Sequence, residues 1–147
     1  MKKFTRILAA ITLALTMVVT FSNAKEVDAA ESGWKTYNGI SANVYTDRTG
    51  DYPVSDSYIG ATGLKTSAGG TVYYRMELDE YVNGAWYSRD SKKGSFSSQT
   101  PMSKFYIDEH LVKGESGTFR VMMKIFSDSE YDIWVGDWIT DSFTVHN

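Results

Sequence analysis

The segment from residue 118 to residue 126 alternates between apolar side chains and mostly polar or charged ones. Successive side chains of a strand point to opposite sides, so Phe119, Val121, Met123 and Ile125 would share one face. This period of two predicts a strand with one face in a hydrophobic core. The strand and its return through residues 138–145 would not be stable as an isolated hairpin, so the rest of the chain must supply a partner sheet.

A second long alternating segment spans residues 71–82 and ends at the dipeptide Asn83-Gly84. Both central positions of a two-residue hairpin turn need positive φ, which Asn and Gly adopt readily. The sequence therefore predicts a tight hairpin with two specific cross-strand pairs, Val82 with Ala85 and Tyr81 with Trp86.

Shorter strand-like segments fill much of the remaining chain, separated by turn signals rich in Gly, Pro and Ser. We expect strands within residues 34–46, 58–66, 94–100 and 103–108, a polar loop at 47–57, and turns at 68–70 and 90–94. Gly60 and Gly63 indicate a bulge or a close approach of backbone. Seven or eight short strands without a crossover helix predict an all-β fold, either an antiparallel β-sandwich, which we favour, or a small barrel.

The first 24 residues have the three parts of a secretory signal peptide. Basic residues at positions 2, 3 and 6 precede an apolar run at 7–21, and small residues follow, with a second cleavage point after Ala29 or Ala30. The run is shorter than the roughly 18–20 residues of a membrane span, so a retained anchor is the less favoured alternative. We expect a signal peptide at 1–24, a flexible leader at 25–33 and a single domain at 34–147, secreted as a monomer without a membrane anchor.

The chain contains no Cys, so its core must hold the domain together without disulfides. Residues 1–24 hold three of the 15 basic residues and none of the 18 acidic ones, which leaves a net charge of −6 on the mature chain. Nucleic acids and anionic membranes require a basic footprint, so we expect neither as a partner.

The entry into the strand at 118–126 resembles the Asp-x-Gly-x-Tyr-x-Cys run that leads into strand F of immunoglobulin-like domains. Glu115 stands in place of Asp, Gly117 is retained, Phe119 stands where Tyr is usual and Val121 where Cys is usual. The resemblance implies an immunoglobulin-like sandwich without the tyrosine-corner hydrogen bond or the inter-sheet disulfide. It also implies that residues 71–78 form strand C, 85–88 strand C′ and 137–145 strand G. The whole chain is similar to small secreted proteins of unknown function from Gram-positive bacilli.

No catalytic or cofactor motif stands out, and we expect a non-enzymatic protein without a cofactor or a metal. His110 and His146 lack a Ser or Cys in a recognisable nucleophile setting, so solvated surface positions are favoured for both. Asp128, Glu130 and Asp132 place three carboxylates at alternate positions of a turn, an arrangement that could hold Ca²⁺. The turn lacks the Gly and the bidentate Glu of a calcium loop, so a solvated turn is favoured over a cation site.

The outward face of the predicted sheet offers the sharpest functional hypothesis. If strands C, F and G are neighbours, aromatic, Met and basic side chains gather there, a composition typical of binding interfaces. The candidate residues are Tyr73, Arg75, Tyr81, Trp86, Arg120, Met122, Lys124 and Trp138. The side taken by Trp138 depends on a bulge near Gly136 or Asp141.

This composition leaves more than one function open. We expect the face to bind a protein or peptide partner outside the cell. One alternative is binding of cell-wall or other polysaccharide through Trp86, Trp134 or Trp138. Another is that these large side chains only cover the sheet, because folded surfaces are always partly apolar. A small secreted enzyme and a structural or stress-related role in the cell envelope are the remaining alternatives.

Overall fold

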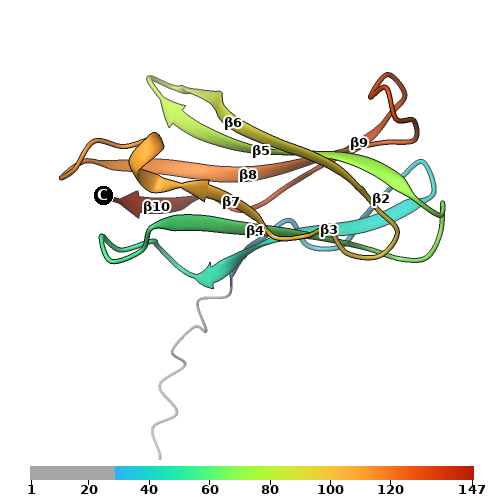
Figure 1. Cartoon of the computed structure of the whole chain (residues 1–147), viewed down its shortest axis with the longest axis horizontal. Coiled ribbons are helices and arrows are strands. Elements are labelled where there is room, and N and C mark those ends of the chain that lie inside the picture. The colour runs from blue at the N-terminus through green and yellow to red at the C-terminus, as the bar shows by residue number, and fades with distance from the viewer. Residues whose placement is uncertain (1–28) are drawn as a thin grey trace, which may run out of the picture.

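Two long strands, β5 (Val72–Val82) and β8 (Ser116–Phe126), lie side by side at the centre of one antiparallel sheet (Figure 1). The computed structural model describes residues 29–147. The sheet that contains β5 and β8, called the second sheet below, has the order β10-β8-β5-β6, and β9 also pairs with β8. The first sheet has the order β1-β3-β4-β7, and β2 also pairs with β3.

The remaining elements are strands of 3 to 12 residues and one 3₁₀ helix. Their bounds are β1 Ala29–Glu31, β2 Lys35–Tyr37, β3 Ile40–Thr49, β4 Tyr58–Lys65, β6 Ala85–Phe96, β7 Ser103–Tyr106, the 3₁₀ helix η1 Ile107–Glu109, β9 Trp134–Ile139 and β10 Phe143–His146. The predicted all-β antiparallel sandwich is confirmed. The expected neighbours of β5 and β8 are found as well, since β6 flanks β5 and both β9 and β10 flank β8.

The alternation at 118–126 forms the core as predicted. Phe119, Val121, Met123 and Ile125 are all fully buried in the core cluster, which both sheets supply. A Cβ added at Gly63 of β4 would overlap the sulfur of Met123, which confirms the close backbone approach predicted for that strand. The two sheets are therefore held together by interlocking side chains, and the first sheet fits closely against β8.

The hairpin between β5 and β6 is confirmed. Asn83 and Gly84 have φ of 51° and 88°, and the cross-strand pairs are those predicted, Val82 with Ala85 and Tyr81 with Trp86.

Strand β6 differs from the prediction beyond this hairpin. The predicted turn at 90–94 and separate strand at 94–100 are wrong, because β6 continues to Phe96. A register shift opposite Leu78 leaves Arg89 unpaired, and the strand then pairs with β5 again. Charged and small polar residues are typical of an edge strand, where they discourage further pairing, so the same residues that suggest a turn also suit this position.

The sandwich begins earlier than predicted. The flexible leader predicted at 25–33 is wrong for its described part, because β1 pairs with β3 through Ala29–Thr49 and Glu31–Tyr45. The predicted signal peptide at 1–24 and the rest of the leader lie outside the described residues. Within residues 29–147, no helix is long and apolar enough to cross a membrane.

The strand predicted at 137–145 is two strands, β9 and β10, with an interruption at residues 140–142. Trp138 faces the core before the interruption, and Phe143 and Val145 face it afterwards. The irregularity therefore lies at Asp141, one of the two positions predicted. The placement of Trp138 on the outward face is wrong: its ring is fully buried, and its indole N–H donates to the carbonyl of Lys35 at 3.0 Å.

A second Asn-Gly pair, Asn38-Gly39, turns β2 into β3 with φ of 46° and 81°. The ring of Tyr37 lies against that of Trp138, with centroids 5.0 Å apart, and Asn38 Nδ2 donates to the carbonyl of Val135 at 2.9 Å. The β2–β3 hairpin thus connects the first sheet to β9 and closes one edge of the sandwich.

We expect Trp138→Ala to destabilise the domain by about 3–5 kcal/mol, since a fully buried ring and its hydrogen bond are lost. Trp134→Ala is the matched control, because Trp134 is 56% exposed and its removal is expected to cost less than about 1 kcal/mol. Urea unfolding followed by far-ultraviolet circular dichroism measures both free energies of unfolding. Equal losses in the two variants would contradict the placement of these two indoles.

Candidate functional site

The register of β5 against β8 brings most of the predicted binding residues to one surface. We call the side of the second sheet that points away from the first sheet the outer face. On it, Arg75 lies opposite Lys124, and Asp79 lies opposite Arg120. Seven of the eight predicted residues share this face, and Trp138 does not: Tyr73, Arg75, Tyr81, Trp86, Arg120, Met122 and Lys124.

Two carboxylates on the outer face are buried although they point away from the core. Glu77 and Asp79 are 6% and 3% exposed. A buried carboxylate is destabilising unless a cation and hydrogen bonds offset its lost hydration. Lys124 Nζ lies 3.3 Å and Arg75 Nη1 3.6 Å from the carboxylate of Glu77, and Arg120 Nε donates to Asp79 Oδ2 at 3.0 Å. The two carboxylates therefore hold three cationic side chains in fixed positions above the sheet.

Arg120 is fixed from a second side by an aromatic ring. Its guanidinium carbon lies 4.3 Å from the centroid of the Trp86 ring, and the Tyr81 ring is 5.1 Å from Trp86. A cation–π contact at an exposed site contributes about 0.5–1 kcal/mol. These three side chains form an ordered corner of the outer face, and Tyr81 is its most exposed member.

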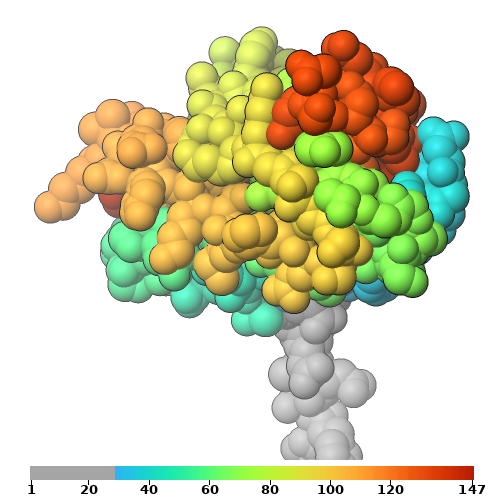
Figure 2. All heavy atoms as spheres, turned by 45° about the vertical axis from the view of Figure 1, so that its right-hand side comes forward, coloured from blue at the N-terminus to red at the C-terminus, as the bar shows by residue number. Residues whose placement is uncertain are grey.

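The opposite end of the outer face is covered by the loop between β8 and β9, which stands beside β6 in Figure 2. Tyr131 of this loop contacts Phe126, with ring centroids 5.4 Å apart, and Lys93 Nζ of β6 lies 4.7 Å from the Tyr131 ring. The guanidinium of Arg75 lies over the Phe126 ring at 5.4 Å. Within the described part of the chain, Arg75 Nε has no hydrogen-bond partner, so this guanidinium is not saturated by its neighbours.

Among the side chains of β5 and β8, the charge that the outer face presents to solvent is positive, and Asp137 of β9, opposite Lys124, adds one partly exposed carboxylate. The side chains of Arg75, Lys124 and Arg120 are 31%, 28% and 22% exposed, whereas those of Glu77 and Asp79 are 7% and 4% exposed. The whole chain has a formal net charge of −3. The outer face therefore differs in sign from the rest of the molecule.

Asp128 orders the β8–β9 loop. Its carboxylate accepts hydrogen bonds from the backbone N–H groups of Ile133 at 2.7 Å and Asp132 at 3.1 Å. These bonds favour the ionised form and hold the pKa of Asp128 below its ordinary value. Among residues 29–147, Asp128, Glu130 and Asp132 do not form a convergent metal-ligand group. The loop places Tyr131 against the outer face.

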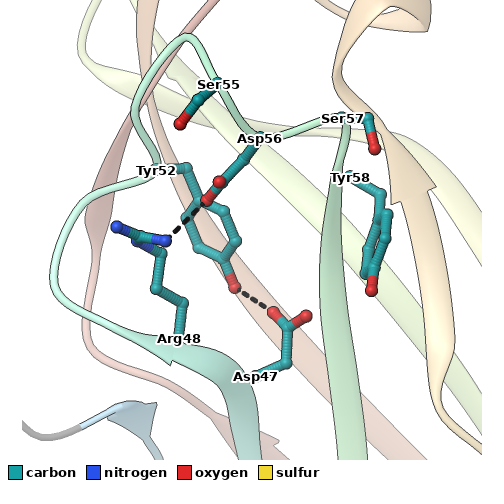
Figure 3. A pocket seen from close by; sticks show the side chains of 7 residues that line it. All are labelled: Asp47, Arg48, Tyr52, Ser55, Asp56, Ser57 and Tyr58. Atoms are coloured by element: carbon teal, nitrogen blue, oxygen red, sulfur yellow. Dashed lines mark hydrogen bonds and ion pairs between the residues drawn. The ribbon is translucent and has the colours of Figure 1, made fainter.

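A polar hollow of about 270 Å³ lies at the loop between β3 and β4 (Figure 3). Tyr52 is 1% exposed, and its hydroxyl donates to Asp47 Oδ1 at 2.6 Å. The same oxygen accepts the backbone N–H of Gly60 at 2.9 Å. Burial, together with the neighbouring Asp47, raises the pKa of Tyr52, so the hydroxyl remains a donor at neutral pH.

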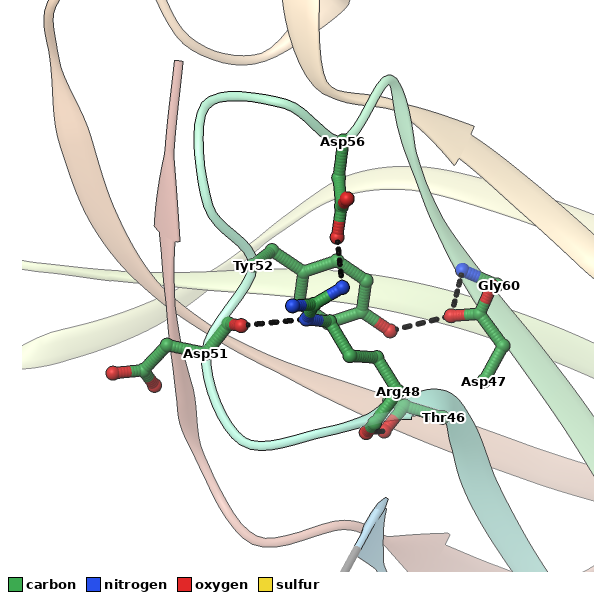
Figure 4. Close-up of polar contacts among 7 residues, drawn as sticks. All are labelled: Thr46, Asp47, Arg48, Asp51, Tyr52, Asp56 and Gly60. Carbon is green, nitrogen blue, oxygen red and sulfur yellow. Dashed lines mark hydrogen bonds and ion pairs between the residues drawn. The ribbon is translucent and has the colours of Figure 1, made fainter. Parts of the chain in front are cut away.

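Arg48 closes the same loop from the other side (Figure 4). Its Nη1 lies 3.0 Å from Asp56 Oδ2, and its Nε donates to the carbonyl of Asp51 at 2.9 Å. The loop is also fixed to β10, because Tyr52 N–H donates to the carbonyl of Thr144 at 2.9 Å. Asp47 pairs with the Tyr52 hydroxyl and Arg48 with Asp56, which indicates a structural clamp.

Comparison with known proteins agrees with this architecture. Residues 27–146 match the YqgA MG2 macroglobulin domain, whose family has an immunoglobulin-like fold. The chain belongs to this family. No curated protein and no solved structure matches it. The match begins two residues before β1, so the N-terminal strands are part of the YqgA MG2 domain.

Several further residues of the outer face of this YqgA MG2 domain are absent from the predicted set, among them Glu77, Asp79, Lys93, Asp137 and Tyr131. The alternating signs of residues 75, 77 and 79 are the signal that could have identified the two carboxylates. Lys93 lies in the segment predicted as a turn. Tyr131 reaches the face from a loop, and no local pattern indicates that contact.

We expect Arg120→Met to destabilise the domain by about 2–4 kcal/mol, because Asp79 would remain buried without its cation. Asp79→Asn combined with Arg120→Met should recover part of this loss, since the uncompensated charge is then absent. A double-mutant cycle of urea unfolding free energies measures the coupling. Strict additivity of the two single losses would show that the pair does not stabilise the outer face.

Proposed function

We propose that this YqgA MG2 domain is exported and acts without catalysis, by binding a protein partner that presents acidic residues to its outer face. The observation that carries this proposal is the arrangement of charge: the cations are held partly exposed, and their counter-carboxylates are buried beneath them. The basic, apolar and small-residue segments within residues 1–24 support export.

The chemistry of the outer face suits a protein interface. Arg, Tyr, Trp and Met are enriched where proteins meet, and Arg, Tyr and Trp are frequent among the residues that dominate binding energy. Arg120 is already held by Asp79 and Trp86, so less side-chain entropy is lost when a partner binds. A positive face on an acidic molecule also orients an acidic partner as it approaches.

Recognition of polysaccharide is the second candidate, and one exposed indole favours it. Trp134 is 56% exposed, and its indole N–H donates to Asp137 Oδ1 at 2.8 Å. A fixed, exposed ring of this kind offers a stacking surface for a sugar. Trp138 cannot take this role because its ring is buried.

The protein proposal is tested with a defined probe, a soluble peptide of alternating Glu and Tyr residues, against a matched peptide of Lys and Tyr. We expect the acidic peptide alone to bind, and its affinity to fall with rising salt. Lys93→Glu should weaken binding by about 3- to 10-fold, because an exposed cation of the outer face is reversed. Fluorescence anisotropy of labelled peptides measures each affinity.

Lys113→Glu is the matched control, since Lys113 is an exposed residue of the loop before β8 and lies outside the outer face. Equal weakening by Lys93→Glu and Lys113→Glu, or no binding of the acidic peptide, would contradict the proposal. Retention on insoluble glycan that is lost in Trp134→Ala would favour the polysaccharide function.

A further inference from the structure

Three potential metal ligands converge at the edge of the sandwich opposite the β2–β3 hairpin. Asp90 belongs to β6 of the second sheet, Glu109 is the last residue of η1, and His110 follows it. One ligand atom from each lies within 4.8 Å of the other two. Because η1 follows directly on β7, the three groups connect the edge strands of both sheets (Figure 1).

His110 is the residue that distinguishes this cluster from ordinary surface charge. The predicted solvated position is wrong for His110, because its side chain is only 8% exposed. Its Nε2 atom is buried and has no hydrogen-bond partner among residues 29–147. It lies 4.0 Å from Asp90 Oδ2, which is too long for a hydrogen bond. A buried polar nitrogen left unpaired in this way costs about 1–3 kcal/mol, so a ligand for it would be stabilising.

Asp90 already holds a cation in the same place. Lys92 Nζ lies 2.8 Å from Asp90 Oδ2, and the ammonium also lies 5.7 Å from the centroid of the Phe105 ring of β7. The Lys92 side chain is 42% exposed, so it is free to move out into solvent. Positive charge at this edge is therefore favourable, and a divalent ion would take the position of the ammonium.

We propose that Asp90, Glu109 and His110 bind one Zn²⁺ ion at the junction of β6 and η1. An imidazole nitrogen with carboxylate oxygens is a donor set that suits this ion, whereas Ca²⁺ takes oxygen ligands. Two ligand atoms on a tetrahedral Zn²⁺ lie about 3.4 Å apart. Separations of up to 4.8 Å would need to shorten by up to about 1.4 Å, which the exposed Glu109 allows.

The ion would have a structural role, because it would strengthen the connection between the two sheets. The chain has no Cys for a disulfide, and the contacts described across this edge of the sandwich are those of Lys92 with the Phe105 ring and of Asp90 with His110. Zn²⁺ at Asp90, Glu109 and His110 would join the first sheet to the second at the same edge. This site is independent of the outer face, because Asp90 and Lys92 pair with Leu78 and Met76, whose side chains are in the core.

The test is titration of the chelator-treated protein with ZnCl₂, followed by isothermal calorimetry and by thermal unfolding. We expect one ion per chain and a rise in Tm that grows with ZnCl₂ concentration. Glu109→Gln and His110→Gln should each weaken Zn²⁺ affinity by at least about 10-fold. Glu109 is exposed, so its variant is expected to fold even if the histidine variant does not.

His146→Gln and Asp108→Asn are the matched controls. They remove the other histidine and a neighbouring exposed carboxylate, and neither belongs to the cluster. Both should bind Zn²⁺ as the unaltered protein does. The proposal is overturned by the absence of saturable Zn²⁺ binding, by equal affinity in Glu109→Gln and the unaltered protein, or by a preference for CaCl₂ over ZnCl₂.

Discussion

The register between β5 and β8 is the constraint on which both faces of the second sheet depend. Met76 pairs with Met123 and Leu78 with Val121, and all four side chains are fully buried. The residues between them necessarily point outward, because strand side chains alternate. A shift of one residue would move charged side chains into the core and apolar ones to solvent. The hydrophobic core therefore also fixes the positions of the cations on the outer face.

The sandwich has neither the disulfide nor the tyrosine-corner hydrogen bond that is typical of immunoglobulin domains, and other contacts connect its parts. At one edge, Tyr37 and Asn38 hold β9 through a ring contact and a side-chain hydrogen bond. At the opposite edge, Lys92 of β6 lies over the Phe105 ring, and Asp90, its ion-pair partner, lies beside His110. The edges are thus joined by polar and aromatic contacts, which also protect edge strands from pairing with other chains.

Much of this fold is predictable from local patterns, because period-two alternation and Asn-Gly turns act over a few residues. The cross-strand pairs around Asn83-Gly84 were predictable for that reason, and Asn38-Gly39 carries the same signal for the β2–β3 hairpin. The prediction of secondary structure failed where contacts outside the local segment decide the conformation. The residues of β6 beyond Arg89 look like a turn, and only their continued pairing with β5, past the register shift, makes them extended.

The candidate site was likewise predictable only in part. The outward residues of β5 and β8 follow from alternation, but the burial of Glu77 and Asp79 depends on neighbours from another strand. The burial of Trp138 depends on the interruption at residues 140–142, and that of His110 on its place beside β6. Contacts between distant segments decide these features, and a single sequence does not show them.

The outer face presents three partly exposed cations on an acidic molecule, and we propose that it is the binding surface. Solvent paramagnetic relaxation measured with an anionic and with a neutral gadolinium chelate tests the charge directly, without a partner. We predict that protons of Trp86 and Arg120 relax faster with the anionic chelate than with the neutral one, because anions concentrate at a positive surface. Protons of Val54, which is 71% exposed in the loop that contains Asp51 and Asp56, should show the reverse. Equal or slower relaxation of the outer face with the anionic chelate would contradict the claim.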